Sequence, residues 1–161
     1  MNEPLDIVIV DDNEERLRDF CSILGEYTQF RNIHHAPDYS KALHKMGTLL
    51  SCDAVLVFDE SDLKKITKFV EKARETDSGS ICSFILVVRP EEALVQEIDK
   101  YASAGIDGFL FQPVDDSKIT SITVVIKKSL QEHKEALEKK LQYKGASELL
   151  RRKYEAKKKQ T

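Results

Sequence analysis

Side chains that could do chemistry stand directly after four apolar segments of this sequence. In chain order, these positions are Asp11-Asp12, Phe58-Asp59, Val88-Arg89 and Gln112-Pro113. The adjacent carboxylates Asp11 and Asp12 make a weak site for a divalent cation physically feasible, because hard cations prefer oxygen ligands. The structural alternative is that Asp12 and Asn13 only cap the helix that follows them. Whether these positions can act together depends on the elements that bring them to one place.

Short apolar segments alternate with helical patterns along the chain. Four segments have the mostly apolar character of buried strands, at residues 6–10, 54–58, 84–88 and 108–111, and residues 32–36 show a weaker strand pattern. Helical spacing predicts helices over 17–24, 39–50, 63–74 and 91–104, and a fifth that opens near residue 115. The pattern predicts an α/β fold, a (βα)5 doubly wound five-stranded parallel sheet with an extended C-terminal helix. Ligands of such sheets bind at the carboxyl ends of the strands, where the four pairs stand.

Three segments carry a resemblance to a known family. The segments IVIVDDNEERLRDF, DAVLVFD and YASAGIDGFLFQPVD resemble the receiver domains of bacterial two-component response regulators, and the resemblance extends from Leu5 to about Val125. It implies a flavodoxin- or CheY-like fold and phosphoryl transfer to an aspartate at the end of the third strand. It also implies Mg²⁺ as a cofactor held by Asp11 and Asp12, and it places Phe109 at the family's aromatic switch position.

Other positions of the family's phosphorylation site are changed. The family's lysine is Gln112 here, since the following Pro113 fixes the register. Glutamine carries no charge, and a lost charge-assisted contact to a phosphoryl group is worth about 1.5–3 kcal/mol. The family's serine or threonine position holds Val88, which cannot donate a hydrogen bond, or Arg89, which could reach a phosphate with a geometry unlike that of lysine.

The position of the phosphoryl acceptor has two alternatives. Counting without a gap from Asp53, which opens the third strand, or back from Arg74 places Phe58 at the acceptor position. A slip of one residue would restore Asp59. We favour Phe58, whose ring would put apolar bulk where a phosphoryl group belongs and would exclude phosphorylation.

Composition and cysteine spacing indicate the cellular compartment of the protein. The chain is 41% hydrophobic and 33% charged, which is typical of a soluble globular protein. Its apolar runs fall far short of the about 20 residues that span a bilayer, and its acidic N-terminus does not resemble a signal peptide. We therefore expect a cytoplasmic protein without membrane partners. Cys21, Cys52 and Cys82 lack metal or redox spacing and are expected to be buried thiols.

The C-terminal part differs in charge and pattern from the rest. Residues 1–115 contain 12 Lys/Arg and 22 Asp/Glu, a net charge of −10, whereas residues 116–161 contain 13 and 6, a net charge of +7. We expect a receiver-like domain over 1–127 and a basic helical extension over 128–161 that forms a coiled-coil dimer. Gly145 is expected to interrupt this helix, and His133 is expected to belong to its apolar seam.

These features favour one function over two others. The preferred hypothesis is a pseudo-receiver, a non-enzymatic signalling module that binds a sensor kinase or a downstream effector without being phosphorylated. The second is a working receiver, with Asp59 as acceptor, Asp11 and Asp12 on Mg²⁺, and Arg89 as substitute cation. Nucleic-acid binding through the basic extension is the least favoured, because no recognition-helix or aromatic pattern accompanies the charge.

Overall fold

Five parallel strands form one sheet at the centre of the molecule. The computed structural model describes residues 3–58, 62–89 and 97–159. The strands are β1 (Leu5–Val10), β2 (Phe30–Ala36), β3 (Ala54–Phe58), β4 (Ser83–Val88) and β5 (Gly108–Phe111). Their order in the sheet is β2-β1-β3-β4-β5, and each neighbouring pair is parallel. The predicted fold class is confirmed, and β2 begins two residues earlier than the sequence pattern indicated.

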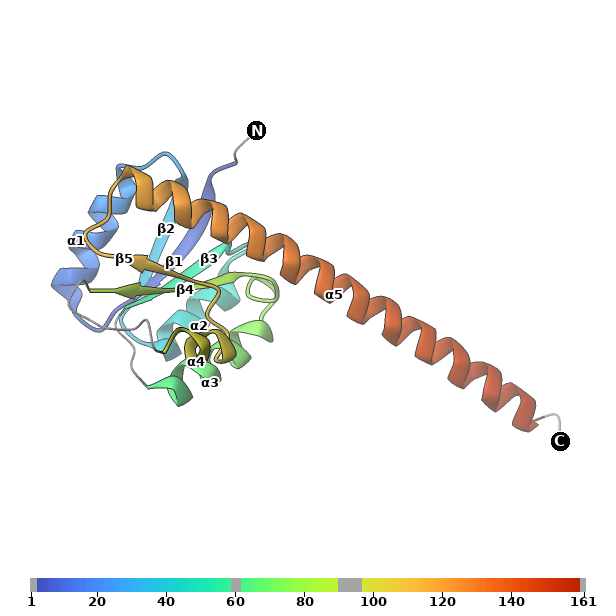
Figure 1. The fold of residues 1–161 in the computed structure, drawn as a ribbon. Coiled ribbons are helices and arrows are strands. Elements are labelled where there is room, and N and C mark those ends of the chain that lie inside the picture. The colour runs from blue at the N-terminus through green and yellow to red at the C-terminus, as the bar shows by residue number, and fades with distance from the viewer. Residues whose placement is uncertain (1–2, 59–61, 90–96, 160–161) are drawn as a thin grey trace.

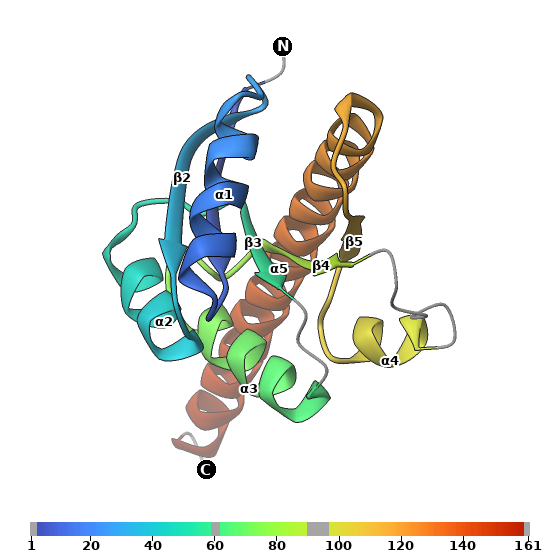
Figure 2. The ribbon, with the colours of Figure 1, turned by 90° about the vertical axis from the view of Figure 1, so that its left-hand side faces the viewer.

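Helices cover both faces of this sheet (Figures 1 and 2). They are α1 (Glu14–Gly25), α2 (Tyr39–Thr48), α3 (Leu63–Arg74), α4 (Ile98–Ser103) and α5 (Asp116–Lys159). The predicted start of the fourth helix at Glu91 lies outside the described residues. Alternating strand side chains fill two cores, because successive residues of a strand point to opposite faces. Ile7 and Ile9 pack with α1 and α5, whereas Val8 and Val10 pack with α2 and α3.

The topology brings the ends of β1 and β3 together. Val10 pairs with Val57 across these two neighbouring strands, so Asp11 and Phe58 emerge at the same edge of the sheet. This edge is the carboxyl end, where doubly wound sheets bind their ligands. The fold therefore places two of the sequence-predicted positions beside each other.

Helix α5 is longer than any other element and leaves the body of the molecule (Figure 1). It contains 44 residues, and its first part packs Ile119, Ile122 and Ile126 against the sheet. The prediction that Gly145 interrupts this helix is wrong, because α5 runs through it to Lys159. One glycine costs a helix only about 1 kcal/mol relative to alanine, and the strong helix formers around it offset that cost. No helix in the described part of the chain is long and apolar enough to span a membrane.

Replacing Gly145 by alanine should stabilise the outer part of α5. A Cβ atom at this position would meet nothing within 4 Å, so alanine adds helix propensity without a steric conflict. We expect a local gain of about 1 kcal/mol, seen as slower amide hydrogen exchange around Gly145. The midpoint of thermal unfolding of the body should not change. Faster exchange around this position in G145A would contradict the expectation.

A polar cluster joins the starts of β1, β2 and β3. The buried Asp6 carboxylate accepts hydrogen bonds from Arg31 Nη2 at 2.7 Å and from Asn32 Nδ2 at 2.8 Å. The Asp53 carboxylate in turn accepts the Asp6 backbone N–H at 2.7 Å. Hydrogen bonding to Arg31 lowers the pKa of Asp6, whereas burial raises the pKa of Asp53. The two carboxyl groups should therefore affect stability with opposite signs as the pH changes.

Asp6→Asn should remove an acid-sensitive part of the stability. Because the folded pKa of Asp6 lies below its unfolded value, its contribution is present above about pH 4 and is lost as the pH falls through the folded pKa. We expect D6N to cost about 2 kcal/mol at pH 7 and less at pH 3, measured by urea unfolding. D53N is the control, since its charged form is disfavoured in the fold and its amide oxygen can still accept the Asp6 N–H. An equal cost of D6N at both pH values would refute this assignment.

Candidate functional site at the carboxyl edge of the sheet

The Asp11 carboxylate is buried and paired with an arginine. Its side chain is 0% exposed at the end of β1. Arg16 Nε donates to Asp11 Oδ2 at 2.6 Å, and Arg16 Nη2 donates to Asp11 Oδ1 at 2.6 Å. The Asn13 N–H donates to Oδ1 as well, at 3.1 Å. Both carboxylate oxygens thus face a planar guanidinium in the two-point geometry that makes arginine–carboxylate pairs strong.

The first turn of α1 positions Arg16. The Asn13 side chain is the N-cap and accepts the Arg16 backbone N–H at 3.0 Å. This cap fixes where the helix begins, and Arg16 is the third residue of the helix. The capping role predicted for Asn13 is confirmed. Arg16 was not among the predicted site residues, although the sequence has this arginine one helical turn after the acidic end of the first strand.

Asp12 does not share the position of Asp11. Its side chain is 93% exposed, and its Oδ1 lies 3.9 Å from Arg16 Nη2. Within the described residues, no three His, Cys, Asp or Glu side chains are grouped so that they could hold a metal ion. The described carboxylates therefore fit a guanidinium better than Mg²⁺, because Mg²⁺ needs several oxygen ligands around it.

Phe58 lies at the end of β3 next to this ion pair. Its side chain is buried, and its ring meets the Phe20 ring edge-on with centroids 4.6 Å apart. The Arg16 guanidinium carbon lies 5.2 Å from the centroid of the Phe58 ring, within the range of a cation–π contact. Arg16 is thus held by a carboxylate and a ring. Asp59, the alternative acceptor, lies outside the described residues.

The remaining predicted positions lie at the ends of β4 and β5. The Gln112 N–H donates to the Val88 carbonyl at 2.9 Å, and the Gln112–Pro113 peptide bond is cis. Gln112 also lines a hollow of about 260 Å³ together with Asn13, Arg16 and Phe20. The Val88 side chain is fully buried and Arg89 is exposed. Phe109 is half-buried and meets the Tyr101 ring edge-on at 6.0 Å.

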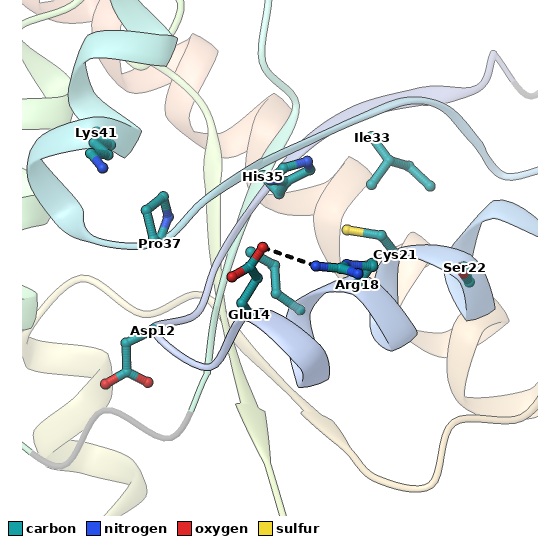
Figure 3. Close-up of a pocket in the computed structure, with 10 residues that line it drawn as sticks. Asp12, Glu14, Arg18, Cys21, Ser22, Ile33, His35, Pro37 and Lys41 are labelled. Atoms are coloured by element: carbon teal, nitrogen blue, oxygen red, sulfur yellow. Dashed lines mark hydrogen bonds and ion pairs between the residues drawn. The ribbon is translucent and has the colours of Figure 1, made fainter.

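A larger hollow lies beside this edge, between α1 and β2 (Figure 3). Its volume is about 710 Å³, and Glu14 and Arg18 form an ion pair of 2.9 Å at its wall. Cys21 also lines it, but burial raises the pKa of this thiol and so disfavours the nucleophilic thiolate. Cys52 and Cys82 are buried free thiols, as predicted.

A second polar cluster at the opposite edge of the sheet fixes α5 to the body. His133 Nε2 lies 2.8 Å from Asp107 Oδ1 and 3.2 Å from Arg74 Nη2, and Asp107 Oδ2 accepts the Phe84 N–H at 2.9 Å. Arg74 Nη1 donates to the Cys82 carbonyl at 2.6 Å, and its guanidinium carbon lies 4.8 Å from the Phe84 ring centroid. His133 therefore makes a polar contact with the body rather than only an apolar one along the helix. The contacts of α5 with the body extend past residue 127, the predicted domain limit.

Comparisons with known proteins find likeness in structure and not in sequence. No family model matches the chain, and no curated protein sequence does. The receiver domain of a sensor histidine kinase from Pseudomonas aeruginosa, which has a magnesium ion in its active-site cleft, is 16% identical with a TM-score of 0.59. The match covers 80% of this chain and 99% of that one. The chemotaxis response regulator CheY4 of Vibrio cholerae is 14% identical with a TM-score of 0.61, over 77% of this chain and 99% of that one.

A third structure, described as adenylate cyclase from Rhodopirellula baltica, is 15% identical with a TM-score of 0.60, over 88% of this chain and 98% of that one. At these identities the likeness concerns the fold. The strand order, the parallel sheet and the placement of the helices agree with the fold that the sequence resemblance implied. The chain has the CheY-like fold of response-regulator receiver domains.

Proposed function

We propose that this protein is a pseudo-receiver, a signalling module that keeps the receiver fold and acts by binding other proteins without being phosphorylated. The observation that supports this most strongly is the two-point pair between Arg16 and the buried Asp11. Such a module would act in the cytoplasm on a sensor kinase or a downstream effector.

The positive charge of Arg16 is already paired within the site. Phosphoryl transfer to an aspartate needs cations that neutralise the transferring oxygens. Here the guanidinium of Arg16 already satisfies the carboxylate of Asp11, and an Mg²⁺ ion would have to displace it. The Phe58 ring adds apolar bulk beside this pair, and Gln112 supplies no charge. Each change weakens a contact that the phosphorylated state requires.

Treatment with a small phosphodonor tests the proposal. We expect that incubation with Mg²⁺ and acetyl phosphate, or with beryllofluoride, changes neither the mass nor the amide NMR spectrum of the full chain. D59N serves as the matched control and should behave like the unmodified protein. A stable adduct on Asp59 that is absent from D59N would overturn the proposal.

That adduct would support the alternative, a working receiver with Asp59 as acceptor. The observation in its favour is the pairing of β1 with β3, which brings the chain just before Asp59 to the edge where Asp11 stands. Asp11 and Asp12 would hold Mg²⁺ in this case, with Arg16 displaced, and Arg89 would contact the phosphoryl group. Labelling by a cognate kinase should then be lost in D59N.

We further propose that the outer part of α5 joins two copies of the chain. Large apolar side chains are exposed there, namely Leu141, Tyr143, Leu149 and Leu150. Exposed apolar side chains on a helix are stabilised when a second helix covers them. Sedimentation equilibrium should give a dimer whose dissociation constant rises with L141E. A monomer at all concentrations would rule out this role of α5.

A further inference from the structure

A group of lysines surrounds a hollow between α3 and α4, on the face of the sheet away from α5. The hollow has a volume of about 430 Å³. The charged residues that line it are Lys64, Lys68, Glu71 and Lys100. Leu63, Thr67 and Ala104 form less polar parts of its wall. The two helices that carry these residues, α3 and α4, are seen in the lower half of Figure 2. We call this surface the lysine groove.

The placement of these lysines opposes helix stability. Lys64 lies in the first turn of α3, where a positive charge is unfavourable against the helix dipole, although the N-cap carboxylate of Asp62 accepts the Lys64 backbone N–H at 3.0 Å. Lys64, Lys68 and Lys72 follow one another at spacings of four residues, so that like charges adjoin along one helix face.

Among the residues that the structure describes, these lysines have no ion-pair partner. Each of Lys64, Lys68, Lys72 and Lys100 is exposed, and within the described residues none of their ammonium groups takes part in an ion pair. This group of positive charges stands on residues 1–115, whose net charge is −10. A hollow lined by three lysines and one glutamate carries a local excess of positive charge, and such an excess on an acidic body can steer an acidic partner to one place.

We propose that the lysine groove binds an acidic helical segment of a partner protein. Carboxylates at positions i and i+4 of such a helix would repeat at about 6 Å, the spacing of the groove residues Lys64 and Lys68 along α3. Lys72, outside the groove, continues this row, so that a third carboxylate at i+8 would also face a lysine. Nucleic acid is a poorer fit, because a duplex carries a charge about every 1.7 Å and would extend over the acidic body around the groove. This inference extends the proposed binding function by naming a surface and the chemistry of its partner.

The probe is a labelled helical peptide of about 16 residues with glutamates at i, i+4 and i+8 on one face. A peptide of the same composition with its glutamates distributed around the helix is the matched control. Binding to the full chain is measured by fluorescence anisotropy. We expect the one-faced peptide to bind at least about tenfold more tightly than the control and to weaken with added salt.

Two triple variants with equal loss of charge locate the site. The groove variant is K64Q/K68Q/K100Q, and the arm variant is K139Q/K140Q/K144Q on the outer part of α5. We expect at least about tenfold weaker binding for the groove variant and less than about twofold for the arm variant. The groove variant should also unfold at a higher temperature than the unmodified protein, because like-charge repulsion is removed. This result would show that weaker binding does not come from a damaged fold.

Carbodiimide cross-linking identifies the lysines that contact the peptide in the unmodified protein. Mass spectrometry should find the peptide carboxylates joined to Lys64, Lys68, Lys72 or Lys100. Cross-links confined to the lysines of α5, equal binding losses in the two variants, or preferential binding of a DNA duplex at the groove would each overturn the proposal. None of these outcomes bears on phosphorylation, which the phosphodonor experiment tests separately.

Discussion

Arg16→Ala should destabilise the protein by about 3 kcal/mol and make its stability depend on Mg²⁺. The substitution leaves the fully buried Asp11 carboxylate without its guanidinium, and an unpaired buried charge is costly. A divalent cation can then restore positive charge next to Asp11. Added Mg²⁺ at about 100 times its dissociation constant would return about 2.7 kcal/mol. Thermal and urea unfolding with and without Mg²⁺ measure both effects.

Arg18→Ala is the matched control on the same helix. Arg18 pairs with Glu14, but both side chains are mostly exposed, at 75% and 84%. Loss of such a surface pair should cost less than about 1 kcal/mol and should create no response to Mg²⁺. If Mg²⁺ stabilises the unmodified protein as much as R16A, then Arg16 does not take the place of the cation.

Phe58→Ala should cost about 3 kcal/mol or more, because a buried aromatic side chain is removed from a packed core. The loss includes the edge-on contact with Phe20 and the contact with the Arg16 guanidinium. Denaturant unfolding of F58A and of the double variant R16A/F58A gives the coupling between the two side chains. We expect the double variant to lose about 1 kcal/mol less than the sum of the single variants.

Phe111→Ala provides the comparison for Phe58. Phe111 lies on β5 and is 42% exposed, so its truncation removes much less buried surface. We expect F111A to cost less than half of what F58A costs. Similar costs for the two variants would mean that Phe58 is not packed at the edge of the sheet as described.

Most of the fold could be predicted from the sequence because it depends on local patterns. Continuous apolar segments such as 54–58 and 84–88 are typical of strands covered on both faces, and glycine or proline marks several of their ends. The order of the strands then follows from the resemblance to receiver domains. Gly145 is the clearest error in the prediction of the elements, because a single glycine was given more weight than the helix formers on both sides of it.

The candidate site could be predicted only in part. The sequence indicated that Asp11 and Phe58 stand at strand ends, but it did not indicate that a side chain from α1 would lie between them. Arg16 could not be predicted as part of the site, because its pairing with Asp11 depends on how α1 packs over the sheet. The contact between His133 and Asp107 could not be predicted for the same reason, since 26 positions separate the two residues along the chain.

The anchoring of α5 at His133 has a mechanical consequence. Beyond this residue the helix continues to Lys159, and this outer segment is about 40 Å long at 1.5 Å per residue. A tilt of about 5° where Asp107 holds the helix would move the far end by about 3 Å, a displacement that a partner seated there could detect. Gly145 lies near the middle of this segment, and its conformational freedom makes the helix easiest to bend there. The length of α5 thus converts a small change at the body into a larger one at a distance.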